Sequence, residues 1–366
     1  IKQRVQAPVN DLNFQSLKRT LDRLFPGSDR QEINWQKIAA AVACLKHFSV
    51  ITGGPGTGKT FTVTKVLALL LEQSPGQKLQ IYLAAPTGKA AARLKETVEE
   101  AKSQLNCHDS IKAAIPPEVF TIHRLLGPIT GSPYFRHNRE NPLMADVVVV
   151  DEASMVDLAL MAKLLEAVPE QARLILIGDK DQLASVEAGS VLGDICDRNV
   201  MHGFSVPFMK RIKEVTGVDL GHRAQTSGAQ SGLQDAIVVL QKSYRFTAGS
   251  GIGDLSRAVN REDTETAFQL LADENDNAIT WQALKADEGL FENLSHQIVS
   301  GYQSYLKAGN PASALQRLQR FKILCALNIG PLGVQAINKL AEQVLRRQNL
   351  IQPDAAPENP WYAGRP

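Results

Sequence analysis

The sequence has few cysteines, little excess charge and no long hydrophobic run. Its four cysteines lie far apart and form no CxxC pair, which favours reduced thiols over a zinc site or a disulfide framework. The net charge is only +2, so any surface that binds a polyanion has to be a local patch. No segment approaches the roughly 18 uncharged apolar residues of a membrane-spanning helix, and we find no secretory signal. These absences favour a protein of the cytoplasm.

What the sequence does contain is an alternation of short apolar runs with helical patterns, such as the one from Trp35 to about His47. The apolar runs are Phe48–Thr52, Leu79–Ala84, Val147–Val150 and Leu174–Ile177. Continuous apolar runs of this length predict buried parallel strands in an α/β layer fold. Ligands of such a sheet bind at the carboxyl ends of its strands, and the chemically interesting residues of this chain follow its apolar runs.

The chain has 366 residues, enough for two or three domains. Residues 1–30 end at a Phe-Pro-Gly-Ser breaker and are predicted to be the tail of an N-terminal domain or a linker. Residues 31–239 are predicted to form a first α/β domain, and residues 240–366 the start of a second, incomplete one. The clearest strand of that second domain is predicted at Phe321–Leu327, before a helical pattern at Val334–Leu345.

Two segments interrupt the alternation. Residues 127–143 are rich in Gly, Pro, Asn, aromatic and basic residues, and they are predicted to form a hairpin or loop inserted in the first domain. Residues 216–232 are rich in Gly, Ser and Gln, which predicts a mobile surface loop. Because the first residue is Ile1 and the final WYAGRP looks like the interior of a domain, we expect the chain to be part of a longer protein.

The first apolar run is followed by a glycine-rich segment, Gly53-Gly54-Pro55-Gly56-Thr57-Gly58-Lys59-Thr60, and then by a helical pattern at Phe61–Leu71. This segment matches GxxxxGK[ST] in the context that a phosphate-binding loop requires. Its glycines let backbone N–H groups approach phosphate oxygens, and the helix N-terminus adds a positive dipole. Lys59 is predicted to reach the β- and γ-phosphates, and Thr60 to bind Mg²⁺. The flanking strand and helix disfavour the alternative, a glycine-rich turn that binds no nucleotide.

Acidic and amide side chains follow two later strands. Asp151 and Glu152 come after the run at 147–150, and Gln182 lies in the GDKDQL segment after the run at 174–177. Asp151 is predicted to hold Mg²⁺, and Glu152 to orient and deprotonate the attacking water. Gln182 is predicted to sense the γ-phosphate or to position the water. Alone, the acidic pair suggests a helix N-cap region and the GDKDQL segment a common turn. Their order behind the phosphate-binding loop favours catalysis.

The order of these motifs resembles that of superfamily 1 helicases, and above all that of the RecD family, the alpha subunits of exodeoxyribonuclease V. The motifs with which such motors contact single-stranded DNA look like AAPTGKAAARL at 84–94 and TIHRLL at 121–126. The similarity extends from about Asn34 to the C-terminal WYAGRP. It implies an ATP- and Mg²⁺-dependent helicase with two RecA-like domains that moves 5′-to-3′ along DNA. It also implies assembly with the beta and gamma subunits of exodeoxyribonuclease V in the bacterial cytoplasm, for double-strand break repair and recombination.

The resemblance also implies roles for residues outside the loop. Gln36 stands where such helicases keep a glutamine that reads the adenine edge. Tyr244 would stack on the base, and Arg245 would reach the γ-phosphate across the cleft, which makes hydrolysis depend on cleft closure. Without the resemblance, a core aromatic residue and a surface ion pair are the simpler interpretations of Tyr244 and Arg245.

The predicted DNA contacts are hydroxyl, backbone amide and cationic groups, which suit phosphates. They are Thr87, Gly88, Lys89, Arg93, His123 and Arg124. For Lys89 and Arg93 the alternative is a solvated helix face. The run from Tyr134 to His137 is either a wedge that splits a duplex, or an exposed loop or partner contact.

Two motifs are not recognisable in the sequence. No carboxylate–lysine nuclease motif has a convincing spacing, so we predict no DNA cleavage by this chain. The late motifs of a second motor domain, including a further arginine, are not recognisable after Arg245, so residues 1–366 alone are expected to bind nucleotide weakly and to hydrolyse it poorly. Two other functions stay open. One is a nucleotide-controlled switch without DNA-dependent turnover, and the other is a stand-alone RecD-like helicase without partner subunits.

Overall fold

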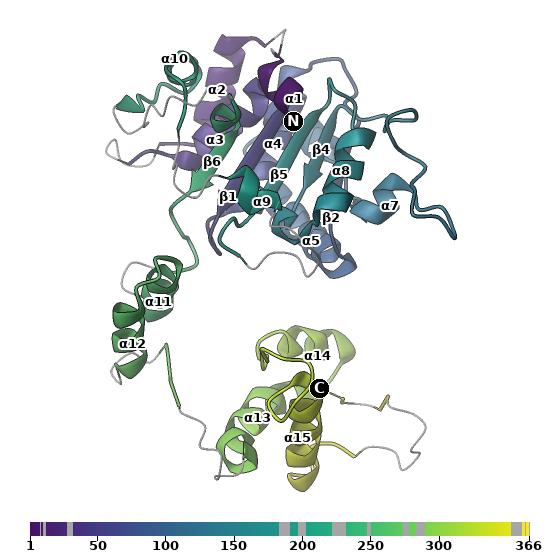
Figure 1. Ribbon diagram of the computed structural model, residues 1–366, viewed down its shortest axis with the longest axis vertical. Coiled ribbons are helices and arrows are strands. Elements are labelled where there is room, and N and C mark those ends of the chain that lie inside the picture. Colours follow the sequence, from purple (N-terminus) through teal and green to yellow (C-terminus); the bar gives the residue numbers. More distant parts are fainter. Residues whose placement is uncertain are drawn as a thin grey trace. The chain divides into compact units, whose positions relative to one another are not determined.

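The computed structural model divides into two compact units, Ile1–Leu270 (unit 1) and Leu271–Pro366 (unit 2), which are described separately (Figure 1). The residues described are 1–7, 9, 12–27, 32–182, 191–196, 203–221, 232–246, 250–273, 278–282, 290–352, 361–362 and 364–365. The loop predicted at 216–232 lies partly outside them, since residues 222–231 are not described. Within the described ranges, no helix is long and apolar enough to cross a membrane.

Unit 1 is built on a six-stranded sheet with strand order β3-β2-β4-β5-β1-β6, in which all neighbouring strands run parallel. The strands are β1 (Phe48–Gly53), β2 (Ile81–Ala85), β3 (Val119–Thr121), β4 (Val147–Val150), β5 (Arg173–Gly178) and β6 (Ile237–Leu240). The predicted α/β fold class is confirmed, as are strands at all four apolar runs of the first domain. The sequence analysis does not predict β3 or β6, since β3 has only three residues and β6 crosses the boundary predicted between the two domains at 239/240.

Side chains alternate along these strands, so the core divides into two hydrophobic clusters, one on each face of the sheet. Ile51 and Val149 belong to the cluster on the first face, and Val50 and Val150 to the cluster on the other. The helices on the first face are α2 (Phe14–Leu24), α3 (Trp35–Leu45), α4 (Lys59–Gln73), α5 (Gly88–Gln104) and α10 (Val206–Thr216). Those on the other are α1 (Lys2–Gln6), α7 (Ile122–Leu126), α8 (Leu158–Ala167) and α9 (Val191–Ile195). The strands are largely apolar because both faces of the sheet are covered.

Shorter or more peripheral helices complete this part of the chain. They are α6 (Asp109–Ala114), α11 (Gly251–Asn260), α12 (Thr264–Ala272) and the 3₁₀ turns η1 (Ala153–Met155) and η3 (Leu233–Ala236). The helices predicted from Trp35 and from Phe61 are confirmed as α3 and α4.

The N-terminal segment packs into the core of unit 1. Asn13 caps α2, and its side-chain oxygen accepts a hydrogen bond from the backbone N–H of Ser16 at 3.0 Å. Leu17 and Leu21 of α2 are fully buried in the same cluster as α3 and α4. Residues 14–25, which lie within the segment predicted as a tail or linker, thus pack as part of unit 1.

Residues 127–143, for which a hairpin or loop is predicted, turn back on themselves after α7. An isolated antiparallel bridge joins Pro128 to Phe135, and the backbone N–H of Arg136 donates to the carbonyl of Gly127 at 2.8 Å. Gly127 itself has a φ of +72°, a left-handed conformation that lets the chain leave α7. Tyr134, at the turn, is 71% exposed.

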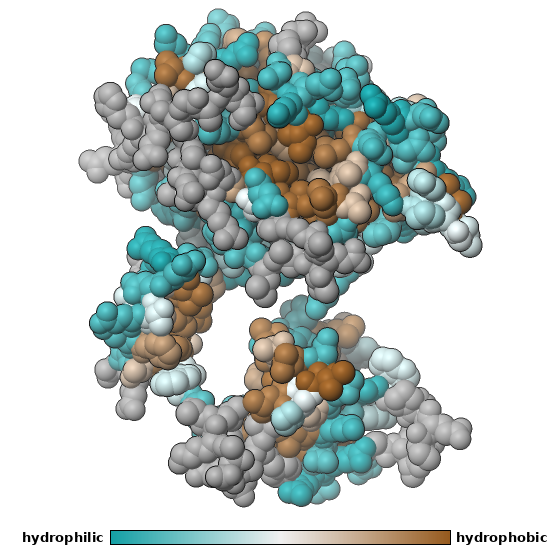
Figure 2. Space-filling view, in the orientation of Figure 1, coloured by the Kyte–Doolittle hydropathy of each residue, from teal (hydrophilic) through white to brown (hydrophobic). Residues whose placement is uncertain are grey.

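Unit 2 contains α13 (Leu290–Leu306), α14 (Pro311–Leu318) and α15 (Val334–Arg347), and the last of these confirms the helix predicted at Val334–Leu345. The strand predicted at Phe321–Leu327 is wrong, because these residues form no ladder. A strand needs a neighbour to pair with, and the described part of unit 2 contains none. Phe321 and Ile323 pack instead against the helical cluster, while Leu324 is 91% exposed. Figure 2 shows apolar side chains gathered on the surface of this unit.

Candidate active site

The glycine-rich loop joins β1, which ends at Gly53, to α4, which begins at Lys59. Gly56 and Gly58 both have a φ of +76°, in the left-handed region that favours glycine. A Cβ at Gly53 would lie 2.7 Å from the carbonyl oxygen of Leu240, so the loop passes too close to β6 for a side chain. This geometry sets the backbone of the loop around the N-terminus of α4, where anions bind.

The side chain of Lys59 turns back onto the loop. Its Nζ donates to the carbonyl oxygens of Gly53 and Gly54, the second at 3.1 Å. Burial lowers the pKa of Lys59, and the carboxylates of Asp179, Glu152 and Asp151 oppose that shift. The ammonium group is therefore held among acidic groups, at a place where phosphate oxygens can replace the two carbonyls as its partners.

Two carboxylates follow β4 and face the loop. The Oγ1 of Thr60 lies 3.5 Å from Oδ2 of Asp151, and burial raises the pKa of Asp151 to about 6. A hydroxyl and a carboxylate are hard oxygen ligands, so this pair fits a divalent cation such as Mg²⁺. Glu152 has a φ of +52°, and its N–H donates to Oδ1 of Asp151 at 2.9 Å. A left-handed backbone conformation at a residue other than glycine reduces the stability of the fold by about 1–3 kcal/mol, and such residues occur most often at functional sites.

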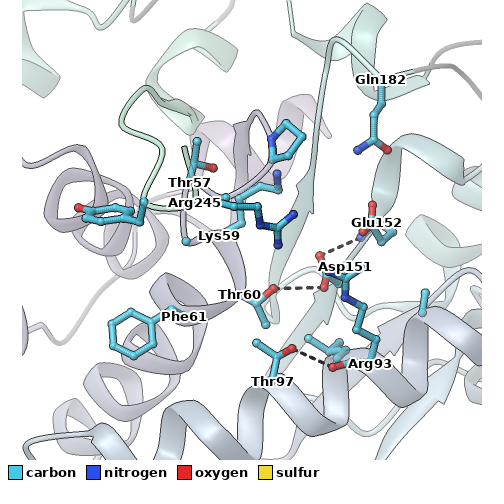
Figure 3. Close-up of a pocket in the computed structure, with 16 residues that line it drawn as sticks. Thr57, Lys59, Thr60, Phe61, Arg93, Thr97, Asp151, Glu152, Gln182 and Arg245 are labelled. Atoms are coloured by element: carbon cyan, nitrogen blue, oxygen red, sulfur yellow. Dashed lines mark hydrogen bonds between the residues drawn. The ribbon is translucent and has the colours of Figure 1, made fainter. Parts of the chain in front are cut away.

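These groups line one cavity of about 710 Å³ (Figure 3). The predicted residues that it brings together are Pro55, Gly56, Thr57, Gly58, Lys59, Thr60, Asp151, Glu152, Gln182, Tyr244 and Arg245. They follow β1, β4, β5 and β6 at one edge of the sheet, as the position of ligands in open parallel sheets requires. Phe61, Ala90, Arg93, Leu94 and Thr97 also line it, and the sequence does not predict them there.

The segment after β6 lies directly on the phosphate-binding loop. The N–H of Tyr244 donates to the carbonyl of Gly56 at 2.8 Å, and Oγ of Ser243 donates to the carbonyl of Pro55 at 3.2 Å. A Cβ on Gly56 would collide with the side chain of Arg245. Arg245 thus lines the cavity with Lys59, and it lies in unit 1 with the loop rather than in a facing domain.

Gln36 lies at a second, smaller cavity of about 190 Å³, which also contains Thr57 and Tyr244 in its lining. Its Nε2 donates to the carbonyl of Thr57 at 3.0 Å. A Cβ on Gly58 would lie 2.6 Å from that same Nε2, which explains why the loop has glycine there. Gln36 and Tyr244 therefore flank one end of the loop, where a nucleotide base would extend from the phosphates.

Asp179 is a site residue that the sequence analysis missed. It directly follows β5 and is only 4% exposed. Its Oδ1 accepts from the N–H of Asp181 at 3.1 Å, and its carbonyl accepts from the N–H of Gln182 at 3.2 Å. Asp179 therefore shapes the turn that carries Gln182. Its position immediately after a buried strand is the signal that could have identified it, as it did for Asp151.

Most of the predicted DNA contacts lie at the carboxyl ends of β2 and β3, which pair with each other. Thr87 caps α5 and accepts from the N–H of Ala90 at 3.2 Å, and the exposed Lys89 follows one residue after Gly88. His123 and Arg124 lie on α7, and Arg124 stacks over the ring of Phe120 at 5.7 Å. Arg93 differs from the others, since it lines the cavity that holds Lys59.

Comparisons with known proteins agree with this arrangement. An AAA domain model matches residues 36–188. The chain is 35% identical over 377 residues to the RecBCD enzyme subunit RecD of Haemophilus influenzae, which covers 97% of this chain and 57% of that protein. It is 40% identical over 360 residues to RecD of Mycobacterium tuberculosis, and this match covers 94% of this chain and 53% of that protein.

Two further similarities cover less or are weaker. The ATP-dependent RecD2 DNA helicase of Deinococcus radiodurans is 48% identical over 140 residues, 38% of this chain and 16% of that protein. A structure of Pif1 helicase from Bacteroides with ADP-AlF3 and single-stranded DNA covers 65% of this chain and 47% of its own, at 23% identity and a TM-score of 0.33. The RecD matches show that the chain is a homologue of RecD, and the chain spans about half the length of the curated relatives it matches.

Proposed function

We propose that the protein is an ATP-dependent translocase and helicase on single-stranded DNA. The observation that carries the proposal is the single cavity that gathers a loop lysine, a hydroxyl–carboxylate pair, a second carboxylate, a glutamine and an arginine. ATP hydrolysis needs each of these groups in a separate role, and a site that only binds nucleotide does not need Glu152 and Gln182 beside the phosphates.

The chemistry follows from the position of each group. Glu152 orients a water molecule and accepts its proton as the oxygen attacks the γ-phosphorus, and the bond to the β–γ bridging oxygen breaks. Lys59 and Arg245 stabilise the negative charge on the phosphate oxygens, and Gln182 senses the γ-phosphate. Thr60 and Asp151 would hold Mg²⁺, which neutralises phosphate charge when bound.

The base end of the nucleotide is assigned to Gln36 and Tyr244. Because Nε2 of Gln36 donates to the carbonyl of Thr57, its Oε1 is the atom that would accept the amino hydrogen of adenine. The ring of Tyr244 is 64% exposed beside the loop, where it can stack on the base. Adenine nucleotides should therefore bind more tightly than guanine nucleotides.

For DNA, we propose that Thr87, Gly88 and Lys89 of α5, with His123 and Arg124 of α7, contact the phosphates of a single strand. The hydroxyl, amide and cationic groups of this set suit a sugar–phosphate backbone. We further propose movement in the 5′-to-3′ direction, assembly with the beta and gamma subunits of exodeoxyribonuclease V in the bacterial cytoplasm, and a role in double-strand break repair and recombination. The printed name of the relatives, RecBCD enzyme subunit RecD, supports the assembly. The wedge role of residues 134–137 belongs to the same proposal.

The test is ATP turnover by the full natural protein with and without single-stranded DNA. We expect DNA to stimulate turnover, and Lys59→Gln to abolish it while the exposed Lys78→Gln leaves it unchanged. Turnover that ignores DNA would favour the nucleotide-controlled switch, and activity that survives in Lys59→Gln would refute the motor.

A stand-alone helicase is the second candidate, favoured by the 48% identity to RecD2 over 140 residues. Co-purification from the native host distinguishes the two. Recovery of the beta and gamma subunits supports the complex, whereas a DNA-stimulated ATPase recovered without them supports the stand-alone enzyme.

A further inference from the structure

Arg93 lies on the face of α5 that lines the phosphate cavity. Four residues of this helix line the cavity, at the three- and four-residue spacing of one helical face: Ala90, Arg93, Leu94 and Thr97. Leu94 is only 2% exposed and belongs to the core cluster that also holds α4. The packing of Leu94 therefore fixes which face of α5 is turned to the site.

The guanidinium of Arg93 extends from α5 toward Asp151 (Figure 3). Within the part of the chain that the structure describes, no hydrogen bond or ion pair to its guanidinium is formed. An arginine stays charged and presents five donors in a planar fork that matches phosphate oxygens. A cation in this position faces the same space as Lys59, Asp151 and Glu152.

We propose that Arg93 contacts the γ-phosphate of bound ATP, and that α5 thereby links the DNA site to the nucleotide site. This inference rests on the proposed function. Gln36 and Tyr244 flank the base end of the loop, so the acidic end, where Arg93 points, is the end of the terminal phosphate.

Helix α5 connects the contact of Arg93 with the γ-phosphate to the DNA site. Lys89, assigned to DNA, and Arg93 are four residues apart on α5, about 6 Å along its axis. The buried side chains of Ala91, Leu94, Val98 and Ala101 hold the helix as one rigid element. Any displacement of its N-terminus on DNA binding therefore moves Arg93 with it.

The experiment compares nucleotide and DNA binding by the full natural protein, with Arg93→Gln, Arg93→Lys and the control Lys95→Gln. Lys95 is an exposed cation two residues along the same helix and lines neither cavity. Fluorescent ADP and a non-hydrolysable fluorescent ATP analogue report nucleotide binding, and a labelled oligothymidine reports DNA binding.

We expect Arg93→Gln to weaken binding of the ATP analogue about tenfold, because only the γ-phosphate loses a partner. The affinities for ADP and for DNA should stay within twofold of the wild-type values. Arg93→Lys should recover part of the loss, and Lys95→Gln should change nothing. Weaker DNA binding, equal losses for ADP and the ATP analogue, or no change in Arg93→Gln would each overturn the inference. If the wild-type protein binds neither nucleotide, the proposed function itself fails.

Discussion

The carboxylate of Asp179 shows how much of this site depends on one buried group. It accepts the N–H of Asp181, and it is the acidic group with the largest effect on the pKa of Lys59. Burial raises the pKa of Asp179, and its hydrogen bond and the charge of Lys59 oppose the shift only in part. The protein therefore keeps an acid at a place where its ionised form is unfavourable, which is typical of a functional position rather than a stabilising one.

Asp179→Asn should raise the melting temperature by about 2 °C at pH 8, because asparagine keeps an acceptor for Asp181 and removes the buried charge. An acid whose folded pKa exceeds its unfolded value destabilises the fold as pH rises through these values. The gain should therefore be smaller at pH 4 than at pH 8, because protonation of the carboxyl removes the buried charge. Thermal unfolding at both pH values measures this, with the exposed Asp181→Asn as the control. A lower melting temperature at pH 8 would contradict it.

Glu152 should be required for ATP turnover but not for nucleotide binding. Glu152→Gln keeps the side-chain shape but accepts no proton, so kcat should fall by about 10²–10⁴ while nucleotide affinity stays within about threefold. DNA-stimulated turnover and fluorescent ADP binding measure the two quantities in the full natural protein. Glu166→Gln, an exposed carboxylate on α8, serves as control. Retention of more than a tenth of the wild-type kcat would show that another group is the base.

At the scale of elements, the short helix α1 is held in place by two buried side chains, those of Arg4 and Val5. Arg4 is 5% exposed, and its guanidinium donates to the carbonyls of Leu165, Val168, Pro169 and Ala172 around the C-terminus of α8. The final carbonyls of a helix have no partner within it. Arg4 supplies donors to them, and its charge complements the negative end of the helix dipole.

Arg4→Met should destabilise unit 1 by about 3 kcal/mol, because several buried carbonyls lose their donors at once. Urea unfolding followed by circular dichroism gives the change in the free energy of unfolding. Lys2→Met, an exposed cation on the same helix, should stay within about 0.5 kcal/mol of the wild type. Equal stability of the two variants would show that α1 docks through its apolar residues alone.

At the scale of the whole molecule, the nucleotide site belongs to one unit. Every residue that lines the two cavities lies between Pro26 and Arg245, within Ile1–Leu270. Unit 2 has a smaller cluster of six buried hydrophobic residues, with Leu324, Leu327 and Ile329 left exposed beside it. The candidate nucleotide site therefore depends on unit 1 alone.

Residues 1–270 alone should bind ADP within about threefold of residues 1–366, since no cavity residue is lost. Both fragments should hydrolyse ATP poorly, because neither contains a recognisable late arginine motif. Fluorescent nucleotide titration and a phosphate-release assay measure these quantities. Binding more than tenfold weaker for residues 1–270, or DNA-stimulated turnover by residues 1–366, would contradict this division.

Local sequence alone is enough for the phosphate-binding loop, the strands at the four apolar runs of the first domain and the acids after them, because each depends on residue types at short spacing. A strand such as Phe321–Leu327 is different, since its apolar residues form a strand only where a neighbouring strand can pair with them. The same limit applies to β3 and β6. They form because β2 offers β3, and β1 offers β6, an edge to pair with.

Tertiary structure decides where the side chains of Arg93 and Asp179 lie. The sequence places Arg93 on a helix with Lys89, but only the burial of Leu94 turns that side chain to the cavity. In the sequence, Asp179 is only part of a predicted turn. The sheet brings its carboxylate near Lys59. Spacing along the chain specifies which functional side chains are present and which helix, strand or loop carries each of them. The direction in which a side chain points depends on what the element packs against, and that is a property of the whole fold.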